Sequence, residues 1–226
     1  KVIGWKQTYA AVPIEDVDSV RYNVVEMMRR ARREAVITSP YLIPGPNGME
    51  TLRHSIETYH VQYTLVTNSL AATDEPVVHT GYRRYRPQML ALGVNLYELS
   101  PQRVSRSLRL GRFSSSIGRL HAKSAVVDQE KVFIGSMNFD PRSDQHNTEM
   151  GLFIDSPVIA QQVLKLVDVI RQQGAYRVTL AADGRDLVWT ATDTSGVDHE
   201  VEEPETDIWT RAMLEVLSVI TPEGLL

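Results

Sequence analysis

The chain has 226 residues, 42% of them hydrophobic, and a formal net charge of −4. A chain of this size and composition can bury a substantial core as one large domain. It contains no cysteine, which excludes disulfides and thiolate-based zinc or redox sites. Its net acidity counts against a general nucleic-acid binder, and no apolar run approaches the roughly 20 residues of a membrane-spanning helix. The chain opens on Lys1 rather than Met, and we expect it to be part of a longer protein.

Helical and extended patterns alternate over the first hundred residues, which favours an α/β domain. The predicted strands are short apolar runs, and the predicted helices have one apolar face. In chain order we predict a helix over 18–34, a strand over 35–43, a loop over 44–48, a helix over 49–59, a strand over 61–67, a helix over 75–92 that Asp74 caps, and a strand over 94–99. This order predicts a mixed, mostly parallel β-sheet flanked by helices.

Polar residues follow two of the predicted strands. They are Ser39-Pro40-Tyr41 and Thr67-Asn68-Ser69. In such sheets ligands gather beyond the carboxyl ends of the strands. These positions are therefore candidates for substrate contact, Tyr41 above all, with ordinary strand-end polarity as the alternative.

A basic loop is predicted over 100–119. It holds five arginines and several serines, has no acidic residue and leads directly into His121. We interpret it either as a basic flap over phosphates or anionic headgroups or as a solvated surface loop. Arg119, the arginine nearest to His121, is a candidate substrate contact. The five arginines are Arg103, Arg106, Arg109, Arg112 and Arg119.

The stretch 119–151 contains the most informative pattern. Apolar runs over 120–127 and 132–136 predict two buried strands, and the residues between them predict a tight turn that begins at Asp128. If the turn centres on residues 129 and 130, the side chains of His121, Lys123, Ser136 and Asn138 gather at the open end of a hairpin. A slip of one residue would divide them between the two faces.

Those four side chains offer an imidazole, an ammonium, a hydroxyl and an amide. The cation and the neutral donors suit the oxygens of a phosphate, and the imidazole can attack phosphorus or transfer a proton. The cluster therefore predicts phosphate chemistry.

The same residues resemble the HKD motif of the phospholipase D superfamily. The motif runs His121-x-Lys123-x4-Asp128, then Gly135-Ser136-x-Asn138. The continuation, Asp140-Pro-Arg142-Ser143 and Asn147-Thr148-Glu149-Met150-Gly151, is similar to bacterial cardiolipin synthases and related phospholipase D-like proteins. The resemblance implies a phospholipase D-like αβα sandwich in which this chain supplies one HKD half. It also implies that two such halves meet at one active site and that the reaction needs no cofactor and no metal.

The resemblance further implies catalytic roles. His121 would attack phosphorus or act as the general acid and base, while Lys123 and Asn138 would hold the phosphoryl oxygens. Ser136 would add a hydrogen bond to the phosphate, and Glu149 would pair with the other ring nitrogen of His121.

Two motif residues and one further histidine have other expected roles. Asp128 and Gly135 are interpreted as structural. His79 lies on the predicted helix over 75–92, which resembles a segment of the synthases and could reach the headgroup; a core or surface histidine is the alternative. No second HKD motif is present, because no other histidine has a lysine two residues later.

The remainder of the chain completes the predicted domain. We expect a helix over 157–173, a hairpin of 176–180 and 186–190 around Asp183-Gly184, an acidic linker over 197–207 and an amphipathic helix over 208–220. The predicted domains are a catalytic half-domain over 1–196 and a linker with a terminal helix over 197–226. That helix would pack on the domain or on its other half, or lie on a membrane.

The combined interpretation is the carboxyl-terminal half of a cardiolipin synthase-type phosphatidyltransferase that works through a phosphohistidine. It would use a phospholipid and an alcohol acceptor, with a second HKD half from the same parent chain or a twin chain. We expect a cytoplasmic location with peripheral contact at the inner membrane. The alternatives are a homodimeric phosphodiesterase or nuclease, although net acidity counts against nucleic acid, and a non-catalytic half used for assembly.

Overall fold

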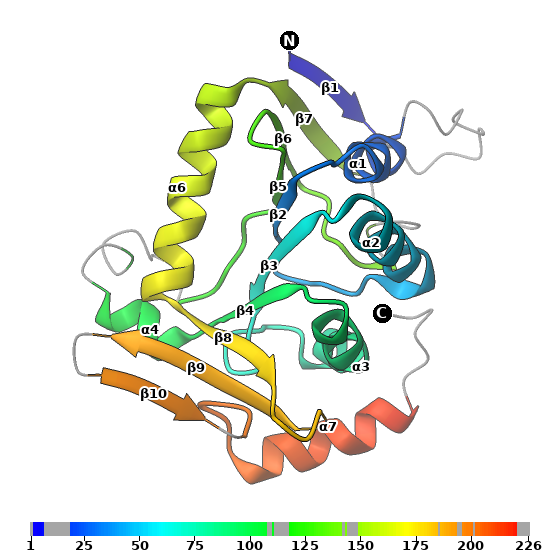
Figure 1. Ribbon diagram of the computed structural model, residues 1–226. Helices are drawn as coiled ribbons and strands as arrows, with labels where there is room; N and C mark the ends of the chain where they lie inside the picture. Colours follow the sequence, from blue (N-terminus) through cyan, green and yellow to red (C-terminus); the bar gives the residue numbers. More distant parts are fainter. Residues whose placement is uncertain are drawn as a thin grey trace.

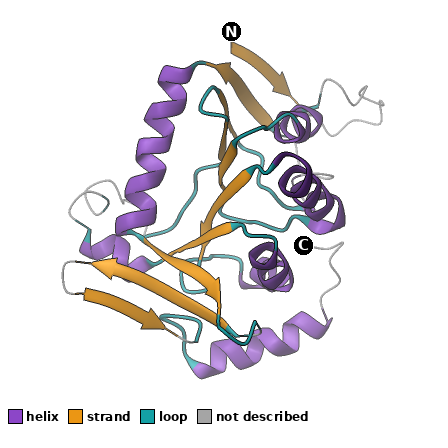
Figure 2. Cartoon of the chain, viewed as in Figure 1, coloured by secondary structure: helices purple, strands orange, loops and turns teal. Residues whose placement is uncertain are grey.

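A ten-stranded sheet forms the centre of the computed structural model, with helices on both of its faces (Figure 1 and Figure 2). The structure describes residues 2–6, 19–107, 110, 118–141, 143, 149–184, 186–193, 196–200 and 202–220. The strands are β1 (Val2–Lys6), β2 (Glu34–Thr38), β3 (Gln62–Asn68), β4 (Asn95–Leu99), β5 (Ser124–Val127), β6 (Lys131–Gly135), β7 (Met150–Asp155), β8 (Ala175–Leu180), β9 (Leu187–Asp193) and β10 (Gly196–Glu200). The helices are α1 (Val20–Arg29), α2 (Gly45–Tyr59), α3 (Pro76–Ala91), α4 (Pro101–Arg106), α6 (Pro157–Gln173) and α7 (Ile208–Ile220).

The strand order is β1-β7-β6-β5-β2-β3-β4-β8-β9-β10. Strands β2, β3 and β4 pair in parallel, and the other described pairs are antiparallel. The sheet is thus mixed and flanked by helices, as predicted, but antiparallel pairs outnumber parallel ones, which corrects the expectation of a mostly parallel sheet. The β-α-β alternation of the first hundred residues does not continue, because later strands are joined by hairpins or by an antiparallel return.

Alternating residues of the central strands divide the core into two layers. Ile37 and Leu65 face α1, α2 and α3 and belong to the largest apolar cluster. Val36 and Val66 point the other way and pack in a cluster with residues of α4 and α6. Figure 1 shows α6 on one side of the sheet and α1, α2 and α3 on the other.

Several helix starts differ from the sequence prediction. Helix α2 begins at Gly45 instead of residue 49, because Pro46 in its first turn fits the helix and needs no donor. Helix α4 occupies part of the predicted basic loop, where the Ser100 hydroxyl accepts a hydrogen bond from the Arg103 amide. Asp74 does not cap α3; its carboxylate accepts a hydrogen bond from the Tyr41 hydroxyl at 2.8 Å.

The turn between β5 and β6 is one residue longer than predicted. Val127 pairs with Lys131, so three residues, 128–130, form the loop. The backbone of Asp128 and Gln129 is left-handed, with φ of 54° and 61°, a conformation that Asp tolerates better than most residues. The Gly135 amide consequently bonds the Lys123 carbonyl at 3.1 Å. The predicted register, with Lys123 opposite Ser136, is therefore wrong.

Asp128 joins this turn to the start of β2. Its carboxylate accepts hydrogen bonds from the backbone amides of Arg32, Arg33 and Glu34, at 2.8–3.2 Å. Its own amide donates to the Glu34 carbonyl at 3.0 Å. The side chain thereby fixes the turn against residues nearly a hundred positions earlier.

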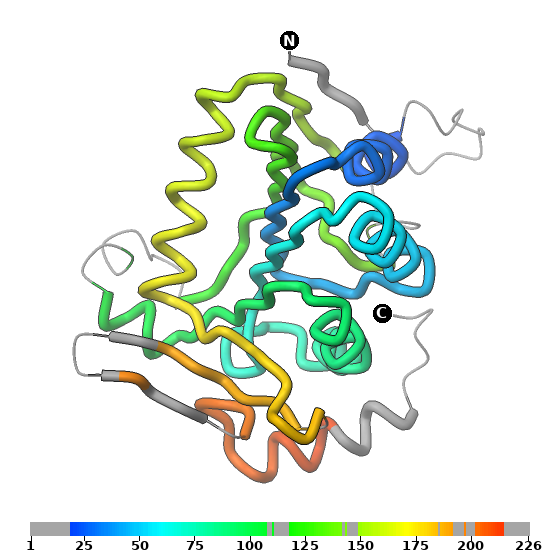
Figure 3. The backbone as a smooth tube through the Cα atoms, viewed as in Figure 1, coloured from blue at the N-terminus to red at the C-terminus, as the bar shows by residue number. Residues whose placement is uncertain are grey.

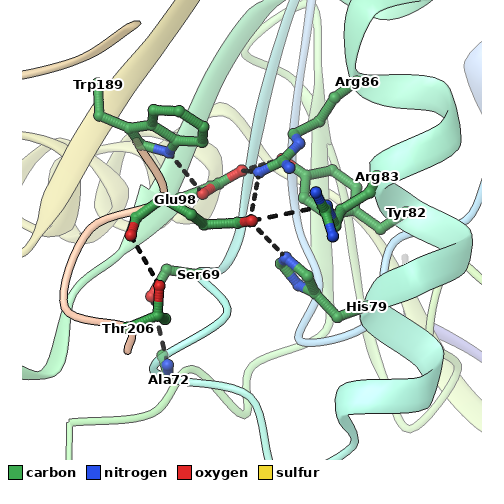
Figure 4. Close-up of polar contacts among 10 residues, drawn as sticks. Ser69, Ala72, His79, Tyr82, Arg83, Arg86, Glu98, Trp189 and Thr206 are labelled. Atoms are coloured by element: carbon green, nitrogen blue, oxygen red, sulfur yellow. Dashed lines mark hydrogen bonds and ion pairs between the residues drawn. The ribbon is translucent and has the colours of Figure 1, made fainter. Parts of the chain in front are cut away.

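A buried polar cluster joins α3, β4, β9 and the segment before α7 (Figure 4). Glu98 accepts hydrogen bonds from Tyr82, Arg86 and Trp189, at 2.7, 2.9 and 2.8 Å. Arg86 also donates to Glu203 at 2.8 Å. The cluster therefore ties the end of the chain to the central sheet.

The segment predicted as an acidic linker is ordered against the domain. Residues 196–200 form β10 beside β9, and Glu203 is only 7% exposed. Figure 3 shows how the following segment turns back and brings α7 beneath α3. A linker was predicted because these contacts are made with residues that are distant in the sequence, and the composition of the segment alone does not reveal them.

Helix α7 spans the predicted residues and packs on α3. Leu214 is fully buried, whereas Ile208 and Trp209 are 68% and 81% exposed. Within the part of the chain that the structure describes, no helix combines the length and the apolar character required to cross a bilayer.

Glu203 is expected to stabilise the fold in a pH-dependent way. Burial alone would raise the pKa of its carboxyl, but the hydrogen bond from His79 and the charges of Arg86 and Arg83 outweigh burial and hold the pKa well below its usual range. The ionised form is thus favoured by folding. We expect Glu203→Gln to lower the free energy of unfolding at pH 7 by about 3–5 kcal/mol, since it leaves a buried cation less compensated. Urea unfolding measures this change.

The same contribution disappears in acid. The unfolded chain takes up the proton first, below about pH 4.3, so the wild-type protein should lose stability as the pH falls from there, and the variant should lose less. Glu202→Gln is the matched control, because Glu202 is exposed and its ion pair with Arg211 is expected to contribute about 0–1 kcal/mol. Equal pH profiles for wild type and Glu203→Gln would contradict this assignment.

The contribution of the Asp128 carboxylate to stability can be tested with two variants, one that removes its acceptor oxygens and one that removes only its charge. Asp128→Ala removes the acceptor for three backbone amides and should lower the free energy of unfolding by about 1–3 kcal/mol. Asp128→Asn keeps one acceptor oxygen and tolerates the left-handed backbone, so it should cost less. Thermal and urea unfolding compare the two variants. An unchanged free energy of unfolding for Asp128→Ala would show that the hydrogen bonds of Asp128 to residues 32–34 contribute little to stability.

Candidate active site

The candidate site lies where the carboxyl ends of β2 and β3 meet the residues before β5. Asn68, the last residue of β3, forms two hydrogen bonds with the backbone of Leu120. Its amide oxygen accepts from the Leu120 N–H at 2.8 Å, and its amide nitrogen donates to the Leu120 carbonyl at 3.1 Å. This double contact fixes the backbone immediately before His121.

The end of β2 holds the second part of the motif in a similar way. The Ser39 hydroxyl accepts a hydrogen bond from the Phe139 amide at 3.1 Å and donates to the Tyr41 carbonyl at 2.5 Å. The Ile43 amide donates to the Phe139 carbonyl at 2.6 Å. The residues after β6 are therefore fastened beside the residues after β2.

His121 and Lys123 lie side by side at this edge. The Lys123 ammonium nitrogen is 3.2 Å from Nε2 and 3.4 Å from Nδ1 of the His121 ring, and it donates to the His121 carbonyl at 3.0 Å. His121 is exposed and Lys123 is half-buried. A phosphate bound by the ammonium would thus reach the imidazole as well.

The charges of three carboxylates act on Lys123. Burial lowers the pKa of its ammonium, and the negative charges of Glu149, Asp74 and Asp140 oppose that effect. Neither Asp74 nor Asp140 was predicted to be a site residue. Their positions in the sequence could have indicated a role, because each residue lies in the segment after a strand whose end borders the site.

Glu149 is buried and interacts with Ser136. The Ser136 hydroxyl donates to the Glu149 carboxylate at 2.5 Å and accepts from the Met150 amide at 2.9 Å. Among the described residues, no hydrogen bond joins Glu149 to His121, so that pairing stays a prediction. Ser136 is occupied by this contact, and a direct bond from Ser136 to phosphate also stays a prediction.

Asn138 has one free atom in the described part of the chain. Its amide nitrogen donates to the Ser143 hydroxyl at 3.2 Å. Its buried amide oxygen has no hydrogen-bond partner among the described residues. Because a buried polar atom is normally paired, the Asn138 amide oxygen is suited to accept a hydrogen bond from a group outside the described residues.

Gly135 leaves room for the ring of Phe133. A Cβ atom at Gly135 would lie 2.7 Å from Cζ of Phe133 and 2.5 Å from the Met150 carbonyl oxygen. Gly151, which pairs with Gly135, is crowded by the same ring. A structural role for Gly135 agrees with this geometry, and the role of Asp128 agrees with its backbone contacts.

Two predicted substrate contacts lie in different surroundings. Tyr41 is half-buried near the site and donates to Asp74. Burial and that hydrogen bond raise the pKa of its phenol, so it remains a donor. His79 is buried in the cluster of Figure 4, with Nε2 3.0 Å from Glu203. Its described partner is thus Glu203 rather than a residue of the motif.

The predicted basic flap is only partly described. Arg103 is buried in α4, and its guanidinium carbon lies 5.3 Å from the centre of the Tyr176 ring, so this arginine packs instead of forming a flap. Arg106 and Arg119 are exposed. Arg109 and Arg112 lie outside the described residues.

The site can bind an oxyanion and offer it a nucleophile. An ammonium and an imidazole lie together at one exposed edge. The one-residue shift in register leaves Ser136 and Asn138 without a described contact to this pair, so the predicted cluster of four is observed only for His121 and Lys123. The described residues contain no group of three His, Asp or Glu side chains placed to hold a metal ion, and independence from metal stays a prediction.

Comparison with known proteins identifies relatives by sequence. The family model "Cardiolipin synthase, PLD-like domain" matches residues 24–170. Cardiolipin synthase C of Escherichia coli is 38% identical over 192 residues, which cover 84% of this chain and 40% of that protein. An uncharacterised protein of Helicobacter pylori is 31% identical over 92% of this chain and 41% of its own length. The chain therefore spans about two fifths of the curated relatives that it matches.

Solved structures show the same fold at low identity. The phospholipase D family member Nuc of Salmonella typhimurium aligns with a TM-score of 0.54 and 19% identity, over 78% of this chain and 98% of Nuc. Phosphatidylserine synthase of Haemophilus influenzae aligns with a TM-score of 0.59 and 14% identity, over 99% of this chain and 46% of that protein. The fold is thus that of the phospholipase D superfamily, and by its sequence the chain belongs to the family of cardiolipin synthase, phospholipase D-like domains.

Proposed function

We propose that this chain is the carboxyl-terminal half of a phosphatidyltransferase of the cardiolipin synthase type. The observation that carries the proposal is the contact between Lys123 and the ring of His121, 3.2 Å from Nε2, at an edge fixed by strand-end hydrogen bonds. Membership of the cardiolipin synthase family supports the choice of a phospholipid substrate.

In the first step a ring nitrogen of His121 attacks the phosphorus of the phospholipid. A P–N bond forms, the P–O bond to the leaving alcohol breaks, and a second imidazole protonates that alcohol. Lys123 and the Asn138 amide nitrogen stabilise the charge on the phosphoryl oxygens. Glu149, which accepts a hydrogen bond from Ser136, contributes a negative charge that favours the ammonium form of Lys123.

In the second step the acceptor alcohol replaces the leaving group. The second imidazole, now neutral, removes the proton of the acceptor hydroxyl. The oxygen attacks phosphorus, the P–N bond breaks and His121 is regenerated. With water as the acceptor, the same steps give hydrolysis. Neither step requires a metal or an added cofactor.

We infer that the second imidazole comes from another HKD half. The other histidines whose side chains the structure describes are His54, His60 and His79, and none of them contacts His121. His54 lies within α2, His60 is the C-cap of that helix, and His79 belongs to the buried cluster. We infer that the exposed edge at His121 is covered by a second half of the parent protein.

An apolar surface beside the motif suits this pairing. Ile134 and Leu152 lie opposite each other on β6 and β7, at 41% and 43% exposure. Met150, on the same face, is 66% exposed and adjoins Ser136. An exposed apolar group of this kind, next to polar catalytic residues, is typical of an interface.

His121 is the first residue to test. In the parent protein, or in this chain paired with its upstream half, His121→Ala should lower phosphatidyl transfer by about 10⁴-fold or more, because no nucleophile remains. The assay follows transfer from phosphatidylglycerol vesicles to an alcohol. His54→Ala, another exposed histidine, is the control and should keep near-normal turnover. Substantial transfer by folded His121→Ala protein would overturn the assignment.

Pairing makes a separate prediction. The isolated 226-residue chain should fold without turning over phosphodiesters, and addition of the upstream half should restore activity. Leu152→Asp should weaken this restoration by at least tenfold, since it places a charge in the apolar surface. Leu166→Asp is the control, because Leu166 is 67% exposed on α6, away from the motif.

The outcomes distinguish the alternatives. Turnover by a demonstrated monomer of this chain would refute the two-half mechanism. Turnover that rises with the concentration of a homodimer would favour the twin-chain phosphodiesterase. A paired protein that binds phospholipid without any turnover would favour a non-catalytic role.

A further inference from the structure

An apolar cavity of about 470 Å³ lies between α1, α2 and the sheet. Its size is within the range of about 300–1,000 Å³ found for small-molecule sites. Its inner walls are mostly buried aliphatic and thioether side chains, together with the rings of Tyr63 and Phe139, and no histidine lines it. Representative lining residues are Val24, Met28, Ile43, Leu52, Leu65 and Met137.

The charged residues of the lining are Arg21 and Asp140. Val25 also lines the cavity and is 39% exposed, so the cavity reaches the surface between the two helices, which lie side by side in Figure 1. A polar ligand would find few partners inside, because burial of an unpaired polar group is unfavourable. The chemistry of the walls therefore selects an apolar occupant.

The cavity and the candidate phosphate site share one stretch of chain. Met137 and Phe139 line the cavity, and Asn138 lies between them in the motif. Asp140 belongs to both regions, because it lines the cavity and its charge acts on Lys123. A ligand with an anionic phosphate at Lys123 could therefore extend an apolar chain toward this cavity.

We propose that the cavity receives one acyl chain of the phospholipid substrate. This inference rests on the proposed function and specifies how its substrate is bound: the phosphodiester at Lys123, and an acyl chain between α1 and α2. Binding of an acyl chain in the cavity makes the protein selective for diacyl phosphodiesters over phosphodiesters with the same headgroup but without acyl chains.

The experiment uses cis-parinaric acid, a fatty acid whose fluorescence increases in an apolar site. The wild-type chain should bind it, and Val25→Trp, which fills the mouth of the cavity, should weaken binding at least tenfold. Val77→Trp is the matched control, because Val77 is 36% exposed on α3 and does not line the cavity. It should bind within twofold of wild type.

Further measurements separate this proposal from the proposed function. If Val25→Trp fails to fold, Thr51→Phe narrows the same cavity from α2. Glycerophosphoglycerol, a phosphodiester without acyl chains, should bind all variants equally by calorimetry. Absence of parinarate binding, or equal binding by the cavity variants and wild type, would overturn the acyl site. Absence of binding is the result expected if a segment of the chain or a second copy of it fills the cavity. Parinarate binding as expected, with no transferase activity in the paired protein, would instead overturn the proposed function.

Discussion

The candidate site depends on two polar side chains that end parallel strands. Asn68 bonds both backbone groups of Leu120, and Ser39 holds Phe139. Because these bonds act on the backbone, the sheet positions the chain segments that carry His121 and Asn138. Reactive side chains held in this way can remain partly exposed and still be fixed, which a site shared between two halves requires.

Local signals predicted much of the fold. Helix α6 has its predicted bounds, since Pro157 and Gly174 mark its start and end, and the hairpin around Asp183-Gly184 is also confirmed. The errors involve long-range contacts. The turn at Asp128 takes a left-handed backbone because its carboxylate bonds amides at residues 32–34. Glu203 is likewise buried by partners from α3, which a pattern of consecutive residues cannot reveal.

The sequence predicted which residues belong to the site better than it predicted how their side chains contact one another. The spacing of His121 and Lys123 predicted their proximity, and that proximity survives the shift in hairpin register because both residues precede β5. Asp74 and Asp140 were missed because an acidic residue after a strand is common. The contact between Ser136 and Glu149 was not predicted, because it depends on the three-dimensional distance between two strand ends.

Strand β1 has a consequence for the solubility of the domain. It pairs with the outer side of β7, with Val2 opposite Ile154, and so satisfies the backbone groups that an edge strand leaves free. The side chains of Leu152 on β7 and Ile134 on the adjacent β6 are exposed. If residues 2–6 were absent, an unpaired edge would adjoin an apolar surface, the combination that promotes strand-to-strand aggregation. Pairing with β1 thus moves the open edge of the sheet one strand away from Leu152.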